Sequence, residues 1–189
     1  ETIDRRLAGN VQAQWAPGRH LLAAGVDAWR EALDSARIEG MTARRTRAAL
    51  YVHDDITVSE RPGGPRVAVA PGGRLDLDSQ FGFNPAVNLA LRVDPATAAQ
   101  IRVSVGQGYR APDFKELYLA LDHASYGYTL SGNEDLRPER STGTNLDARW
   151  TLEKRVELRA QASWDEVRDL IQPGLRAAAA AGSPAVYGY

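Results

Sequence analysis

The sequence contains no cysteine, which excludes disulfide bonds, cysteine-ligated zinc and thiol chemistry. It also lacks a run of the roughly 20 consecutive apolar residues that a membrane-spanning helix needs. The longest uncharged run, residues 177–189, consists mainly of Ala, Gly, Ser and Pro. A helical membrane protein is therefore excluded. A membrane β-barrel is not, because only every second residue of a barrel strand faces lipid.

No charge of one sign dominates the chain. Its 23 Lys and Arg residues are interleaved with 24 Asp and Glu residues, so the net charge is −1 and no nucleic-acid partner is expected. The histidines show no metal-ligand spacing, and no phosphate-binding or nucleophile motif is present. Three carboxylate pairs lie in expected strands or turns: Asp54 with Asp55, Asp76 with Asp78, and Glu134 with Asp135. The sequence therefore predicts a protein that is not an enzyme and has no cofactor or resident metal.

Apolar residues alternate with polar ones along much of the chain. In residues 7–15 the odd positions are Leu, Gly, Val, Ala and Trp, whereas the even positions are Ala, Asn and Gln. This two-residue period is typical of a β-strand with one apolar face. Seven further segments show it, around residues 22–28, 47–58, 67–77, 87–93, 101–105, 146–152 and 156–164, with one interruption at Asp54. The pattern predicts an all-β, antiparallel fold with about eight strands.

The connections between these strands differ in length. Short turns rich in Pro, Gly or charged residues are predicted at residues 16–19, 61–64, 94–97 and 153–155. The intervening links are residues 31–44, a short polar link at 79–82, and a long loop at 111–141. Short turns at one rim and longer loops at the other are typical of outer-membrane barrels. Five aromatic residues near strand ends or outward faces fit aromatic girdles, or packing in a core: Trp15, Trp29, Tyr51, Trp150 and Trp164.

The polar face of the strands carries Arg, Asp, Glu, Asn and Gln together. Such a face suits the interior of a wide barrel that holds water or a polar plug. Pattern alone leaves two alternatives open. One is a complete, small eight-stranded membrane barrel with a structural role, and the other is a soluble β-sandwich binding module. Residues 173–184 are expected to form a loop, which leaves no room for a closing strand.

Two segments flank the long loop and carry the most specific signal. The first, from Gly106 to Leu119, reads GQGYRAPDFKELYL, and the second, from Gly132 to Ser141, reads GNEDLRPERS. In this order and at this separation they resemble the GFRAP…KELY…GNPDLKPERS signature of TonB-dependent outer-membrane receptors. The resemblance extends over residues 19–172. Tyr109 replaces the usual Phe of the signature, and Glu134 stands where Pro is common.

The resemblance implies that residues 1–189 form part of a receptor barrel of about 22 strands. It also implies that the plug domain and the N-terminal region that contacts TonB are missing from this chain. The implied location is the bacterial outer membrane, with lipid as a partner, and the loop at residues 111–141 is expected to be extracellular. The implied activity is active import of a scarce nutrient.

The motif residues are interpreted as loop architecture, because the signature is shared by receptors for different cargoes. Glycines can admit a neighbouring backbone, and prolines end strand pairing. Arg110, Glu116, Glu139 and Arg140 are predicted to form an ion-pair network at the rim. The full architectural set is Gly106, Gly108, Tyr109, Arg110, Ala111, Pro112, Glu116, Leu117, Tyr118, Gly132, Asn133, Leu136, Pro138, Glu139, Arg140 and Ser141.

The loop between the two motif segments is expected to contact the cargo. A ferric siderophore is the default, because siderophore uptake is the commonest task in this family. Haem and cobalamin are the alternatives. His123 lies where related haem receptors place a His that ligates iron, and Tyr126 and Tyr128 could stack on a siderophore or corrinoid.

Overall fold

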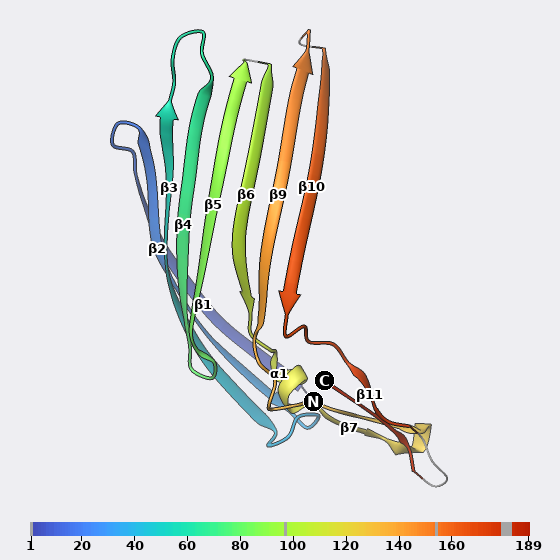
Figure 1. Ribbon diagram of the computed structural model, residues 1–189. Coiled ribbons are helices and arrows are strands. Elements are labelled where there is room, and N and C mark those ends of the chain that lie inside the picture. Colours follow the sequence, from blue (N-terminus) through green and yellow to red (C-terminus); the bar gives the residue numbers. More distant parts are fainter. Residues whose placement is uncertain (1, 97, 154, 179–182) are drawn as a thin grey trace.

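The computed structural model describes residues 2–96, 98–153, 155–178 and 183–189. Eight long antiparallel strands form one sheet in the order β1-β2-β3-β4-β5-β6-β9-β10 (Figure 1). Their bounds are β1 Thr2–Trp15, β2 His20–Ser35, β3 Thr42–Ser59, β4 Arg66–Asp78, β5 Gly82–Ala96, β6 Ala99–Arg110, β9 Glu139–Leu152 and β10 Val156–Arg168. The predicted all-β fold and its eight main strands are thus confirmed. None of the described helices is long and apolar enough to cross a membrane.

The strand register places the apolar residues of neighbouring strands side by side. Val11 pairs with Val26, Val26 with Leu50, and Leu50 with Leu75. The same face continues through β5, β6, β9 and β10, where Leu91 pairs with Val103 and Val103 with Leu146. Since a slip of one residue would move every side chain to the opposite face, this alternation fixes the register.

The apolar face forms a band that nothing in the described chain covers. Leu7 is 77% exposed, Val11 69%, Leu158 56% and Trp164 76%. An exposed apolar surface of this extent is unusual for a soluble monomer and suits a surface that faces lipid.

The two ends of the sheet differ as expected. The connections at one end are short, since β2 begins soon after β1 ends and β4 begins soon after β3 ends. Thr97 and Lys154, which belong to two of the predicted short turns, lie outside the described residues. The opposite end, called the loop rim below, holds residues 36–41, 79–81, 111–138 and the C-terminal segment (Figure 1).

The prediction of a long link at residues 31–44 was wrong, because β2 continues to Ser35 and β3 begins at Thr42. The physical reason is a change of face. Leu33 and Ala43 pair with each other on the face that is polar elsewhere, and both are buried. Near the loop rim, loops cover the concave face, whereas the outer face carries exposed charged side chains. The apolar residues therefore change sides, which hid these strand ends in the sequence.

Two of the residues predicted for aromatic girdles lie on the polar face. Trp29 packs under the guanidinium of Arg47, 5.4 Å from its ring centroid, and the hydroxyl of Tyr51 donates to Gln12. Trp15, Trp150 and Trp164 do lie on the apolar face.

The interruption at Asp54 has a structural explanation. The Asp54 carboxylate lies 2.7 Å from Nδ1 of His20 on the neighbouring strand. This pairing accommodates a carboxylate within the apolar row.

A second, four-stranded sheet lies at the loop rim in the order β11-β12-β8-β7. Its strands are β7 Ala120–His123, β8 Tyr128–Ser131, β11 Gly174–Ala177 and β12 Ala185–Gly188. The prediction that residues 173–184 form only a loop was therefore wrong, since β11 falls inside that range. These short strands have little alternation of their own, so only pairing with distant segments reveals them. In the main sheet, β1 and β10 remain the two edges and do not pair with each other, so the described strands do not form a closed eight-stranded barrel.

Candidate functional site at the loop rim

The first motif segment forms a capped helix directly after β6. Helix α1 spans Phe114–Tyr118, and the side chain of Asp113 accepts hydrogen bonds from the backbone of Lys115 and Glu116. The Glu116 carboxylate in turn accepts from the backbone N–H of Asp113 at 2.7 Å. This capping box satisfies backbone donors that the first helical turn leaves free. It explains why a helix of five residues forms here at all.

Arg110 ties this helix to two strands. Its guanidinium donates to Glu116 at 3.0 Å and, through two nitrogens, to Glu139 at 2.7 and 2.9 Å. The predicted ion-pair network is confirmed for these three residues. Arg110 and Glu139 lie beyond the apolar band, at the loop ends of β6 and β9, and Glu116 lies on α1. The hydrogen bonds from Arg110 lower the pKa of the Glu139 carboxyl to about 2.

Arg140, the fourth predicted member, does not join this network. Its guanidinium donates to the side-chain oxygen of Asn84 on β5 at 3.0 Å. β5 and β6 are paired only as far as Asn88 and Gly106. Arg140 therefore links β9 to β5 in the region where β6, the strand between them, is no longer paired with β5.

The second motif segment packs against the end of α1. Gly132 donates from its backbone to Leu119 at 2.6 Å, and Asn133 donates to Glu116 at 2.8 Å. A Cβ atom on Gly132 would collide with the carbonyl of Leu117, so a larger residue cannot fit without moving the backbone. Gly108 leaves room in the same way for the side chain of Ser141. Residues of both motif segments thus contact one another or the neighbouring strand within the loop rim.

A buried arginine anchors the loop to β3. Arg45 is 3% exposed, and its Nη1 donates to the carbonyl oxygen of Pro112 at 2.6 Å. The guanidinium also lies 5.0 Å from the ring centroid of Phe114 and 3.3 Å from the Glu31 carboxylate. A buried guanidinium needs such partners, because desolvation without them is very costly.

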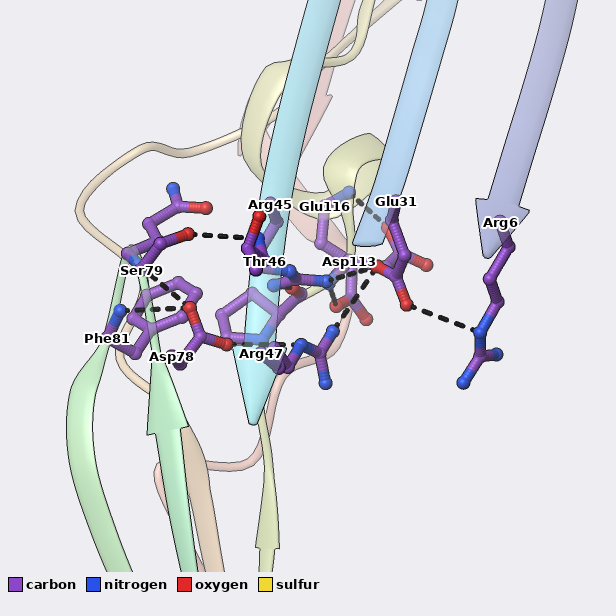
Figure 2. Close-up of polar contacts among 12 residues, drawn as sticks. Arg6, Glu31, Arg45, Thr46, Arg47, Asp78, Ser79, Phe81, Asp113 and Glu116 are labelled. Carbon is purple, nitrogen blue, oxygen red and sulfur yellow. Dashed lines mark hydrogen bonds and ion pairs between the residues drawn. The ribbon is translucent and has the colours of Figure 1, made fainter. Parts of the chain in front are cut away.

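Further charged residues extend this contact across four strands (Figure 2). Glu31 also pairs with Arg47 at 3.4 Å and with Arg6 at 3.8 Å, and Arg47 pairs with Asp78 at 3.1 Å. Asp78 accepts from the backbone of residues 80 and 81 and so holds the turn between β4 and β5. We call Glu31, Arg45, Arg47 and Asp78 the rim network. It contains two positive and two negative charges, so it is balanced.

The rim network was not predicted from the sequence. Its members stand on the polar face of three adjacent strands, where alternation in β2, β3 and β4 places each of them. Their shared place on the polar face, given by the two-residue alternation, is the sequence signal that could have predicted the rim network. Their contact with Pro112, 67 residues away, leaves no trace in the sequence.

The three residues expected to contact cargo lie together at the tip of the β7–β8 hairpin. Nδ1 of His123 is 2.8 Å from the hydroxyl of Tyr128, and the His123 ring meets both tyrosine rings edge-on at 5.8 and 5.3 Å. Tyr126 is 80% exposed. Gly127 has a φ of 86°, which permits the tight turn. The cluster presents aromatic faces, a phenol and an imidazole to solvent, but no group of three metal ligands occurs among the described residues.

Residues 3–184 match the family described as "TonB dependent receptor-like, beta-barrel". The chain belongs to the TonB-dependent receptor family. Its sheet is therefore a portion of a receptor barrel in the bacterial outer membrane.

Relatives of this receptor chain are much longer than it is. An iron-regulated outer membrane virulence protein of Vibrio cholerae serotype O1 is 27% identical over 160 residues, which cover 82% of this chain and 24% of the relative. The vitamin B12 transporter BtuB of Vibrio vulnificus is 33% identical over 98 residues, covering 52% of this chain and 14% of that protein. The chain thus spans about a quarter or less of the curated relatives it matches.

Solved structures share the fold of this receptor chain. The siderophore receptor PirA of Pseudomonas aeruginosa has a TM-score of 0.77 at 21% identity, with 98% of this chain and 36% of PirA covered. A mutant of the ferric enterobactin receptor PfeA of the same organism, in complex with enterobactin, has a TM-score of 0.70 at 21% identity and covers 99% and 31% of the two chains. At these identities the likeness establishes the barrel fold.

Proposed function

We propose that this chain supplies barrel wall and a cargo-contacting rim to a receptor that imports a ferric siderophore with energy from TonB. The carrying observation is the folded loop rim. Arg45 and Arg110 fix the long loop on the strands, and the loop presents the His123, Tyr126 and Tyr128 cluster to solvent. A rim of this kind combines a rigid base with an exposed aromatic surface, which suits capture of an aromatic ligand.

The polar concave face supports a transport role. Arg74 pairs with Asp27 at 2.6 Å and with Asp76 at 2.9 Å, and Arg92 pairs with Asp94 at 2.7 Å. These ion pairs keep the wall hydrophilic while they limit its net charge. Such a wall accommodates water or a polar domain inside the barrel.

The names of the relatives favour iron as the cargo element. One relative is iron-regulated, and two fold neighbours are siderophore receptors. Cobalamin is a second candidate, because a 98-residue match at 33% identity is to a vitamin B12 transporter. Haem would have His123 as its axial ligand. Since Nδ1 of His123 is occupied by Tyr128, Nε2 is the nitrogen that would bind iron.

Growth of an iron-starved strain tests the proposal directly. The complete gene product that contains this chain is expressed in a strain that lacks its own siderophore, haem and cobalamin receptors. We expect growth on ferric siderophores, and we expect deletion of tonB to abolish it. Growth restored only by haem would assign haem as the cargo. Cobalamin contains cobalt and cannot relieve iron starvation, so it is tested separately by growth of a cobalamin-requiring strain. Uptake that persists without TonB would contradict active transport.

A further inference from the structure

The outer face of the sheet changes character between β1, β2 and β3. Rows of cross-strand neighbours can be followed from the apolar band toward the loop rim. The row of Gly9, Ala28, Ala48 and Leu77 is apolar. The next row toward the rim joins Leu7, Arg30 and Thr46, and the row after that joins Arg5, Ala32 and Arg44. Three arginines therefore stand on the outer face at the edge of the lipid-facing band.

The three arginines form a compact group, called here the Arg30 cluster (Arg5, Arg30 and Arg44). Neighbouring strands are about 4.8 Å apart, so Arg5 and Arg44 flank Ala32 at about 10 Å between their backbones. Arg30 lies one row below, on the central strand. Guanidinium groups on such long side chains can reach a common point between them.

Two members of the Arg30 cluster have no polar side-chain partner in the described part of the chain. Arg5 pairs with Asp34 at 3.2 Å, and Asp34 also accepts from Thr42. Arg30 and Arg44 are exposed, and no hydrogen bond or ion pair of their side chains is found among these residues. Among the described residues around the cluster on the outer face, Asp34 is the one carboxylate, since Asp54 lies toward the other end of β3. The cluster therefore carries an excess of two positive charges.

An apolar groove of 970 Å³ opens directly below the cluster. Small residues at Gly9, Ala28 and Ala48 form its floor, and Arg30 and Thr46 stand at its rim. Its walls are Leu7, Val11, Val26, Leu50, Leu75 and Leu77. Because these residues belong to the lipid-facing band, the material that fills the groove in the membrane is hydrocarbon.

We propose that the Arg30 cluster and the groove form a binding site for an acylated lipid whose phosphate headgroup has a net negative charge. Guanidinium groups bind phosphate oxygens in a two-pronged geometry, which favours Arg over a diffuse positive surface. The acyl chain lies in the groove, and the phosphate lies between Arg30 and Arg44. Charge excess and groove occur on the same face, one row apart, as this lipid requires. The site is independent of the transported cargo.

Native mass spectrometry tests the site on the complete gene product, purified in mild detergent. The probes are lipid A, which carries two phosphates, phosphatidylcholine, which is zwitterionic, and inorganic phosphate. The charge variant is Arg30→Gln with Arg44→Gln. Its matched control is Arg102→Gln with Arg159→Gln, which removes two positive charges from the polar face of the same sheet. Gly9→Leu places a bulky side chain on the groove floor without changing charge, because the space beside Gly9 is open.

We expect lipid A to bind the unaltered protein and the control equally, and to bind the charge variant about tenfold more weakly. Gly9→Leu should also weaken the binding of lipid A, while the fold, monitored by circular dichroism, stays unchanged. Equal lipid A binding by the charge variant and the control would overturn the proposal. The proposal would also be overturned if phosphatidylcholine bound as tightly as lipid A, or if inorganic phosphate alone displaced lipid A. A lipid-free dimer that is lost in the Arg30 and Arg44 variant would overturn it as well. Growth on siderophore is scored separately, so loss of lipid binding and loss of transport are distinguishable.

Discussion

Nη1 of Arg45 donates a 2.6 Å hydrogen bond to the carbonyl oxygen of Pro112, and this bond joins a barrel strand to the longest loop. The guanidinium is buried, and the ring of Phe114 lies 5.0 Å from it. The loop is therefore fixed to β3 by a charged group that is almost fully shielded from solvent. This contact makes the loop rim a folded unit, with Leu33, Ile38, Ala43 and Phe114 as its apolar core.

Arg45→Ala should release the loop. It removes the donor to Pro112 and one of the partners of the half-buried Glu31, which we expect to cost about 1–3 kcal/mol of local stability. Hydrogen exchange of the backbone amides in residues 111–119 measures the effect. Arg66→Ala is the matched control, because Arg66 is exposed and forms a loose ion pair, at 3.9 Å, with the exposed Glu60. Unchanged protection in Arg45→Ala would show that Arg45 does not anchor the loop.

Gly132→Ala should disrupt the same loop by a different route. The added methyl group would meet the backbone of Leu117 and Leu119, so residues 132–133 must withdraw from α1. We expect a loss of roughly 1–3 kcal/mol, as for other forced contacts in packed regions. Limited proteolysis of the loop provides the measurement. Gly174→Ala, where the added atom meets open space, should leave the cleavage rate unaltered.

Glu139→Gln should reveal the contribution of Arg110 through its pH dependence. The pKa of Glu139 is lowered in the folded protein, so its carboxylate stabilises the loop above its unfolded pKa. That contribution declines as pH falls from about 4.5 toward 2, where the carboxyl becomes protonated in both states. Loop protection should therefore differ between Glu139→Gln and the unaltered protein at pH 6 and converge near pH 2. A difference that stays constant over this range would exclude the carboxylate charge as its origin.

Tyr126→Ala should weaken cargo binding by about tenfold while the fold is retained, because an exposed aromatic side chain contributes to ligand contact more than to packing. Tyr187→Ala is the control, since Tyr187 belongs to the same small sheet but not to the aromatic cluster. Binding of labelled ferric siderophore to cells gives the comparison. Equal affinity of the two variants would place the cargo elsewhere on the rim.

Leu158→Arg should hinder barrel assembly. A charge on the lipid-facing side of a barrel strand costs about 2–4 kcal/mol at the bilayer midplane. Gln161→Arg places the same side chain on the polar face of the same strand, beside Asp147, and should be tolerated. Heat-modifiable migration of membrane fractions on gels reports the folded fraction. Comparable folding of both variants would mean that the outer face does not meet lipid.

The sequence by itself determined the main sheet, because the two-residue alternation of 156–164 or 7–15 records which face is lipid and which is polar. The order of the two motif segments likewise determined the family, and the charges of Arg110, Glu116 and Glu139 determined their pairing. The sequence did not predict the strand ends at which the apolar residues change faces. Leu33 and Ala43 reverse the pattern near the rim, so the extensions of β2 and β3 read as a loop.

Only the tertiary structure decided how the rim is built. In the small sheet, β8 pairs with β12. In the rim network, Arg45 on β3 contacts Pro112, which is 67 residues away in the sequence. Such contacts depend on where loops fold in space, and no local pattern in either segment encodes the other. The same holds for the Arg30 cluster. Arg5, Arg30 and Arg44 are separate in the sequence and become one surface only because three strands pair in a fixed register.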